Sequence, residues 1–261
     1  MFSFPFMQNA FVVGTLIAIV SGALGVFVVA RQMAFLTHVL GEIGFAGAAF
    51  GLFMSWSPLV GMALFTTVAA TMVGQLGAKQ RHADAVIATV SSVAIGLGVA
   101  FLALAHKNAS AATSILFGSI FSIDHSNVLQ VCGLSVIVLA LLVLIFRPLR
   151  HYAFDFATAQ YTIKHVDLLG IVFLVLMALT VAVSAQIVGS LLIFILMTIP
   201  ASAALRWGGS PQAMVGRSVF FALLGVWSAL VLAYVTDMPV SFFIAMIEAG
   251  IYLVTLALTR A

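Results

Sequence analysis

The chain has 261 residues, of which 64% are hydrophobic and only 7% carry a charged side chain. Soluble domains average roughly 25% charged residues, so this composition excludes an ordinary soluble globule and indicates a polytopic membrane protein. The formal charge of +3 is too small to suggest a nucleic-acid-binding protein, and the single cysteine, Cys132, excludes a disulfide framework or a thiolate metal site.

A series of apolar segments predicts an all-α bundle of transmembrane helices that forms a single domain, residues 1–261. A helix needs about 20 apolar residues to cross roughly 30 Å of hydrocarbon. The expected spans are 10–30, 33–53, 58–77, 85–105, 127–146, 168–186, 187–205, 213–235 and 239–258. The sixth and seventh of these are nearly continuous, so they form either a tight hairpin or one long bent helix. The chain therefore has eight or nine spans.

The positions of the cations predict which face is cytoplasmic. With nine spans, Arg31, Arg260 and the basic residues of segments 79–81, 147–164 and 206–217 share one face, and Lys107 lies opposite. The positive-inside rule makes the shared face cytoplasmic, in an inner (plasma) membrane, with the N-terminus outside. The outer stretch 107–127 is moderately apolar and suits a short re-entrant or interfacial helix.

The sequence lacks the motifs of the common hydrolases. It contains no G-x-x-x-x-G-K-[ST] phosphate loop, no H-E-x-x-H and no G-x-S-x-G. Serines within the spans, such as Ser91, are more often helix-packing residues than nucleophiles. We therefore expect no enzyme and no permanently bound cofactor.

Two ionisable residues lie within the second expected span. His38 and Glu42 are four residues apart and so share one helix face. Counted from Arg31, they lie about 10 and 16 Å deep, at depths where ionisable residues are rare and usually functional. Imidazole and carboxylate together suit Zn²⁺, Mn²⁺ or Fe²⁺. The alternative is that the two side chains simply pair with each other. The same span carries Gly41, Gly44, Gly47 and Gly51, which predicts close helix packing.

Other polar residues give weaker predictions. Glu248, in the last span, is a candidate for a second polar site, with pairing to a neighbouring helix as the alternative. Asp237 precedes Pro239 and suits a turn. A candidate outer mouth for an incoming cation is formed by segments 106–126 and 236–240, with the following ionisable residues: His106, Asp124, His125 and Asp237.

Several strings together resemble the ABC-3 family, the permease subunits of zinc and manganese ABC transporters. They are GALGVFVVARQMAFLTHVLGEIGFAGAAFG (22–51), ADAVIATVSSVAIGLGV (83–99), LFGSI (116–120), VGSLLIFILMTIPASAALRW (188–207) and TDMPVSF (236–242). The resemblance covers essentially the whole chain. It implies a fold like that of type II ABC importers.

The resemblance also implies partners. These are a second copy of the permease, a separate cytoplasmic ABC ATPase and an extracytoplasmic metal-binding protein, assembled at the lipid membrane. The family's ATPase-coupling segment corresponds to about 147–167, where Phe154, Asp155 and Ala159 match. The family's acidic residue soon after the aspartate and its later glycine are missing here.

One departure from the family affects the expected metal site. The family typically has an aspartate followed four residues later by a histidine, whereas this chain has His38 and then Glu42. The pair keeps one imidazole and one carboxylate at the same spacing, so we expect a retained metal site with altered geometry. The expected function is import of Zn²⁺ or Mn²⁺, with Fe²⁺ also compatible. The alternatives are a proton-coupled secondary transporter, with Glu42 as the proton relay, and a membrane scaffold without transport activity.

Overall fold

The computed structural model describes residues 5–76, 83–106, 109–118, 125–190 and 192–259. Within these residues the regular structure is entirely helical. The helices are α1 (Pro5–Ala30), α2 (Ala34–Phe53), α3 (Pro58–Leu76), α4 (Ala83–Leu104), α5 (Ala109–Phe117), α6 (His125–Leu144), α7 (Phe146–Phe154), α8 (Phe156–Thr162), α9 (Val166–Val188), α10 (Ile193–Arg206), α11 (Pro211–Thr236) and α12 (Val240–Leu258).

Each of the nine expected spans overlaps one helix of 14 to 26 residues, which confirms the polytopic helical fold. Five of these helices, α1, α2, α9, α11 and α12, are long and apolar enough to cross a membrane. A sixth candidate joins α6 to α7 through a bend of 72°. The described apolar parts of α3, α4 and α10 are shorter.

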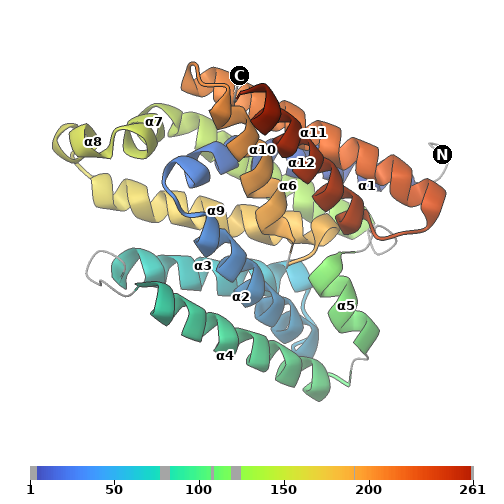
Figure 1. Ribbon diagram of the computed structural model, residues 1–261. Helices are drawn as coiled ribbons and strands as arrows, with labels where there is room; N and C mark the ends of the chain where they lie inside the picture. The colour runs from blue at the N-terminus through green and yellow to red at the C-terminus, as the bar shows by residue number, and fades with distance from the viewer. Residues whose placement is uncertain (1–4, 77–82, 107–108, 119–124, 191, 260–261) are drawn as a thin grey trace.

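The nearly continuous apolar stretch after residue 168 divides into two helices, α9 and α10. Gly189 caps α9 with a φ of 86°, which strongly favours glycine. A Cβ at this position would also come within 2.5 Å of the Gly118 backbone nitrogen, directly after α5. The chain turns sharply here (Figure 1), because the glycine conformation ends one helix before the next begins.

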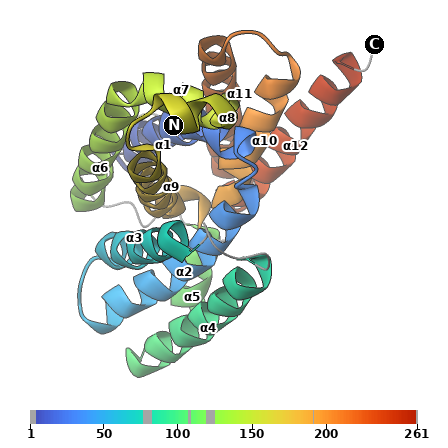
Figure 2. The same ribbon diagram turned by 90° about the vertical axis from the view of Figure 1, so that its left-hand side faces the viewer.

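The helices pack as two groups with α9 between them. On one side α2 packs against both α3 and α4, and on the other α1 packs against α10 and α11 (Figures 1 and 2). Figure 1 places α5 and the α11–α12 turn at one end of the bundle. The α1–α2 connection lies at the other end with α7 and α8. This arrangement agrees with the expected outer and cytoplasmic ends.

Three short helices lie outside the predicted spans. The helix expected within 107–127 is α5. The polar stretch 146–169 contains α7 and α8, which the apolar pattern does not predict because both are short. Pro148 lies in the first turn of α7, where a missing N–H breaks no helical bond. The side chain of Asp155 caps α8 by accepting a hydrogen bond from the Thr158 N–H at 3.2 Å.

Candidate functional site

The ionisable pair of the second span lies in the N-terminal half of α2. Nε2 of His38 is 3.5 Å from Oε1 of Glu42, one helical turn away. The His38 side chain is 36% exposed and that of Glu42 is 14% exposed. The pair is therefore half-enclosed by the bundle, open enough to meet an ion yet largely removed from solvent.

Two further helices complete the surroundings of the pair. The hydroxyl of Ser91, a buried residue on α4, donates a hydrogen bond to Oε2 of Glu42. The His38 ring meets the edge of Phe194 on α10, with 5.1 Å between centroids. Nδ1 of His38 is buried and has no hydrogen-bond partner within the described ranges. Sequence reasoning treated Ser91 as a packing residue. The signal for its role is its place in a stripe of small residues on α4 that faces α2, namely Ser91, Ala94 and Gly98.

Glycines bring the neighbouring backbones against α2, as the sequence predicts. A Cβ on Gly47 would overlap the Gly61 carbonyl of α3, and a Cβ on Gly41 would overlap the Ser190 carbonyl in the α9–α10 connection. Gly44 differs, because a Cβ there would make only ordinary contacts of 3.4–3.5 Å. The site is therefore built on a helix that is fixed closely at two positions, on either side of Glu42.

The spacing of the two ligand atoms fits a metal ion. Zinc bonds to imidazole nitrogen and carboxylate oxygen are about 2.0–2.2 Å long, so two ligand atoms at tetrahedral angles lie about 3.4 Å apart. The Nε2–Oε1 distance is 3.5 Å. No third His, Cys, Asp or Glu joins this pair in the described part of the chain. The described part of one chain thus offers two such ligands, and any others would come from other groups, from water or from another chain.

Glu248 is separate from the pair. Its side chain in α12 is completely buried, and neither carboxylate oxygen has a hydrogen-bond partner among the residues that the structure describes. It lies against α11, where a Cβ on Gly225 would overlap Oε1 of Glu248. The alternative, pairing with a neighbouring helix, is therefore not seen in the described part of the chain, and the second polar site stays a prediction.

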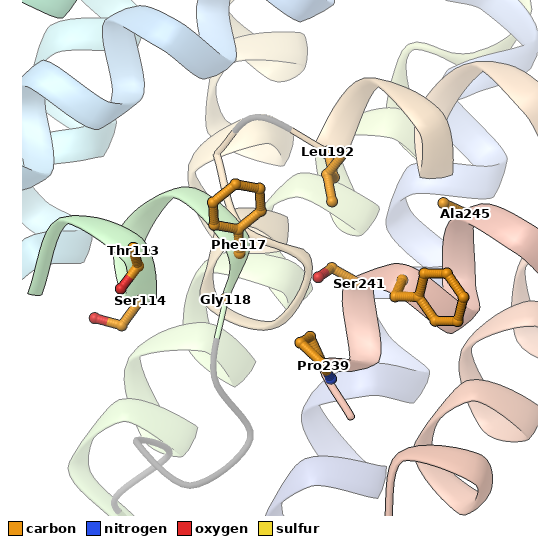
Figure 3. Close-up of a pocket in the computed structure, with 9 residues that line it drawn as sticks. Thr113, Ser114, Phe117, Gly118, Leu192, Pro239, Ser241 and Ala245 are labelled. Carbon is orange, nitrogen blue, oxygen red and sulfur yellow. The ribbon is translucent and has the colours of Figure 1, made fainter. Parts of the chain in front are cut away.

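The predicted outer-mouth segments meet at a cavity of about 600 Å³ between α5 and the starts of α10 and α12 (Figure 3). Its lining is mainly apolar, with Phe117 and Leu192 facing Ser241 and Pro239 across the space. Of the predicted ionisable residues, the two whose side chains the structure describes, His106 and Asp237, do not line it. His106 and Asp237 are exposed at helix ends with positive φ, Asp124 lies outside the described residues, and only the backbone of His125 is described, at the start of α6.

The predicted coupling residues surround the junction of α7 and α8. Phe154 is 39% exposed, Asp155 is exposed and Ala159 is buried. The hydrogen bonds from the side chain and backbone of Thr158 lower the pKa of Asp155, so the carboxylate that caps α8 stays ionised at neutral pH. Ala159 is the buried residue of α8, so it lies on the side of that helix that packs against the rest of the protein. The family resemblance does not single out two aromatic residues of α8, Tyr161, which is exposed, and Phe156, which is 37% exposed.

The helical bundle and the ionisable pair on α2 define a multi-pass membrane transport protein. The sequence pattern of the ABC 3 transport family matches residues 3–259, and the chain belongs to this family. The match leaves no stretch of these 261 residues for an ATP-hydrolysing domain.

Known proteins resemble the chain over nearly its full length. The high-affinity zinc uptake system membrane protein ZnuB of Haemophilus influenzae is 26% identical over 97% of both chains. The manganese import system permease protein ScaB of Streptococcus parasanguinis is 26% identical over 97% of this chain and 90% of its own length. Among solved structures, PsaBC from Streptococcus pneumoniae, in complex with Fab, superposes with a TM-score of 0.89 at 24% identity over 97% of this chain and 91% of that one. This likeness confirms the fold.

Proposed function

We propose that this protein is the membrane-spanning subunit of an ABC importer for a divalent metal cation, Zn²⁺ or Mn²⁺, with His38 and Glu42 as ligands of the ion in transit. The observation that carries the proposal is the 3.5 Å spacing of Nε2 and Oε1, which matches two ligands of one ion. Family membership and the relatives named for zinc and manganese support the same class of cargo.

The proposal includes three kinds of partner. A separate ATPase docks at α7–α8 and supplies the energy, a metal-binding protein delivers the ion at the outer end, and a second copy of the chain pairs with the first. Two such ligands in the described part of each chain favour pairing, because Zn²⁺ prefers four. A transit site with few permanent ligands also suits transport, since an ion that is held too tightly cannot leave.

Within the chain, each residue has a defined task. Glu42 supplies negative charge that offsets the cost of bringing a dication into a region of low dielectric. His38 supplies a neutral nitrogen ligand. Ser91 orients the carboxylate through Oε2 and leaves Oε1 toward His38. The closely packed glycines hold α2 so that the two ligands keep their spacing.

The experiment is uptake of radioactive Zn²⁺ and Mn²⁺ by cells or vesicles that contain the full transporter. His38→Ala and Glu42→Gln should each reduce uptake at least tenfold, since even indirect partners of metal ligands cost about 10–100-fold when removed. Ser92→Ala, at an exposed serine of α4 whose hydroxyl bonds the Ala88 carbonyl of its own helix, is the control and should transport normally. Normal uptake by both site variants, at normal membrane levels, would refute the site. Uptake without an ATPase would favour a proton-coupled carrier.

A further inference from the structure

The side chain of Arg31 contacts both helices of the coupling segment from the α1–α2 connection. Its Cζ lies 4.4 Å from the ring centroid of Tyr152 in α7 and 4.2 Å from that of Phe156 in α8. Nη2 also makes a long contact of 3.5 Å with the Tyr152 hydroxyl. Both rings lie within the range of favourable cation–π interaction. One side chain thus joins the α1–α2 connection to both α7 and α8. Figure 2 shows these two short helices beside the end of α1.

The connection that carries Arg31 is a tight turn with little freedom. The Gln32 N–H bonds to the Val29 carbonyl at 3.0 Å, and the Met33 N–H bonds to the Val28 carbonyl at 2.9 Å. Gln32 has a φ of 57°. These features form a Schellman motif, which closes the end of α1. Because α2 begins at Ala34, a displacement of Arg31 reaches the start of α2, which is four residues, or about 6 Å of helix, from His38.

The two coupling helices are anchored differently. Tyr152 of α7 is buried and packs against Phe173 of α9 at 6.2 Å, and Phe27 of α1 meets the edges of Phe146 and Phe154. The α8 helix packs mainly against α7. Its Phe156 ring contacts Arg31 and is still 37% exposed. A protein that docks on α8 and moves it would therefore also move the Phe156 ring, which contacts Arg31 of the α1–α2 connection.

We propose that Arg31 is a positioning residue that transmits movement of the α7–α8 segment to α2, and so to His38 and Glu42. This inference rests on the proposed function, because it needs an ATPase that docks at α7–α8. Arginine suits the task since its flat guanidinium stays charged and stacks on aromatic faces, whereas the compact ammonium of lysine does not stack in this way. Loss of the Arg31 contacts leaves the ATPase docking site and the metal ligands in place, but movement of α7–α8 is then no longer passed on to α2.

The test compares ATP hydrolysis and metal uptake in the same proteoliposomes, which contain the permease, its ATPase and its metal-binding protein, with Zn²⁺ and Mn²⁺ as probes. Arg31→Met should reduce the metal imported per ATP hydrolysed by about tenfold, a typical size for coupling between sites, while ATP hydrolysis continues. Arg31→Lys should lie between Arg31→Met and the unmodified protein. The matched control is Arg206→Met. Arg206 of α10 also lies over an aromatic ring, that of Tyr252 of α12 at 5.6 Å, but this contact does not involve α7 or α8.

The outcomes separate this inference from the proposed function. If the unmodified transporter couples hydrolysis to uptake and Arg31→Met keeps the same ratio, the inference is wrong and the proposed function stands. If the unmodified transporter imports no metal with ATP, both fail. Should Arg31→Met not assemble, Phe156→Leu removes one ring and leaves the arginine in place. A lowered ratio in that variant supports the inference, and an unchanged ratio overturns it.

Discussion

Replacing either of two glycines of α2 by alanine should have opposite effects on the stability of the protein. In Gly47→Ala, the new Cβ would lie 2.8 Å from the Gly61 carbonyl carbon and 2.9 Å from Cβ of Phe65. In Gly44→Ala, the nearest atoms would be the ends of Met62 and Thr66 at 3.4 and 3.5 Å. The chemical change is the same, and only the distance to the neighbouring helix differs.

The contacts set the magnitude. Bringing the Gly61 carbonyl carbon to an ordinary 3.4 Å requires α3 to move away by at least about 0.6 Å, because the carbonyl oxygen lies closer still, and gaps of that size forfeit about a quarter or more of the dispersion energy of the facing atoms. Overpacking of this kind costs about 1–3 kcal/mol. Alanine recovers about 1 kcal/mol of helix propensity at either position, so the difference between the two variants isolates the packing cost.

The assay is thermal unfolding of the purified protein in one detergent, with Zn²⁺ uptake measured in parallel. Gly44→Ala should match or exceed the unmodified protein in Tm. Gly47→Ala should fall below Gly44→Ala by several degrees, at roughly 2–4 °C per kcal/mol for a chain of this size. Equal Tm values for the two variants would refute the close approach of α2 and α3 at Gly47.

Two further predictions concern buried polar groups. Ser91→Ala should weaken metal binding about 10–100-fold because Glu42 loses the group that orients it. The control is Ser92→Ala, at an exposed neighbour whose hydroxyl bonds its own helix at 3.0 Å, and it should bind the metal normally. Equal binding of the metal by both variants would contradict the role of Ser91. Glu248→Leu should raise the free energy of unfolding by about 1–3 kcal/mol because it removes a buried carboxyl without hydrogen-bond partners. A lower Tm for this variant would show that Glu248 has a partner that stabilises the fold, and a higher Tm with slower uptake would indicate that Glu248 is kept for transport.

The sequence predicts the long helices well because a membrane imposes a length and a composition on each span. All nine apolar segments became helices, and the positions of Gly47 and Gly41 against neighbouring carbonyls follow from their small size. Periodicity could not predict α7 and α8, because each depends on a local cap or bend rather than on apolar length.

The candidate site was predictable only in part. The spacing of His38 and Glu42 fixes their common face, since both lie on one helix. Their surroundings come from α4 and α10, which are distant in the sequence, so the hydrogen bond from Ser91 and the ring of Phe194 required the structure. The cation–π contacts of Arg31 are likewise long-range, and a basic residue at a membrane boundary has an ordinary explanation in the positive-inside rule.

The closed turn between α1 and α2 has a consequence for how this protein can vary. Because α2 starts directly after a turn that holds α1, the rotation of α2 about its own axis is set by the number of residues in the connection. One inserted or deleted residue would turn everything after it by about 100° and carry the two ligands to another side of the helix. A change in the length of this connection therefore displaces both ligands at once, whereas a substitution in it leaves their direction unchanged.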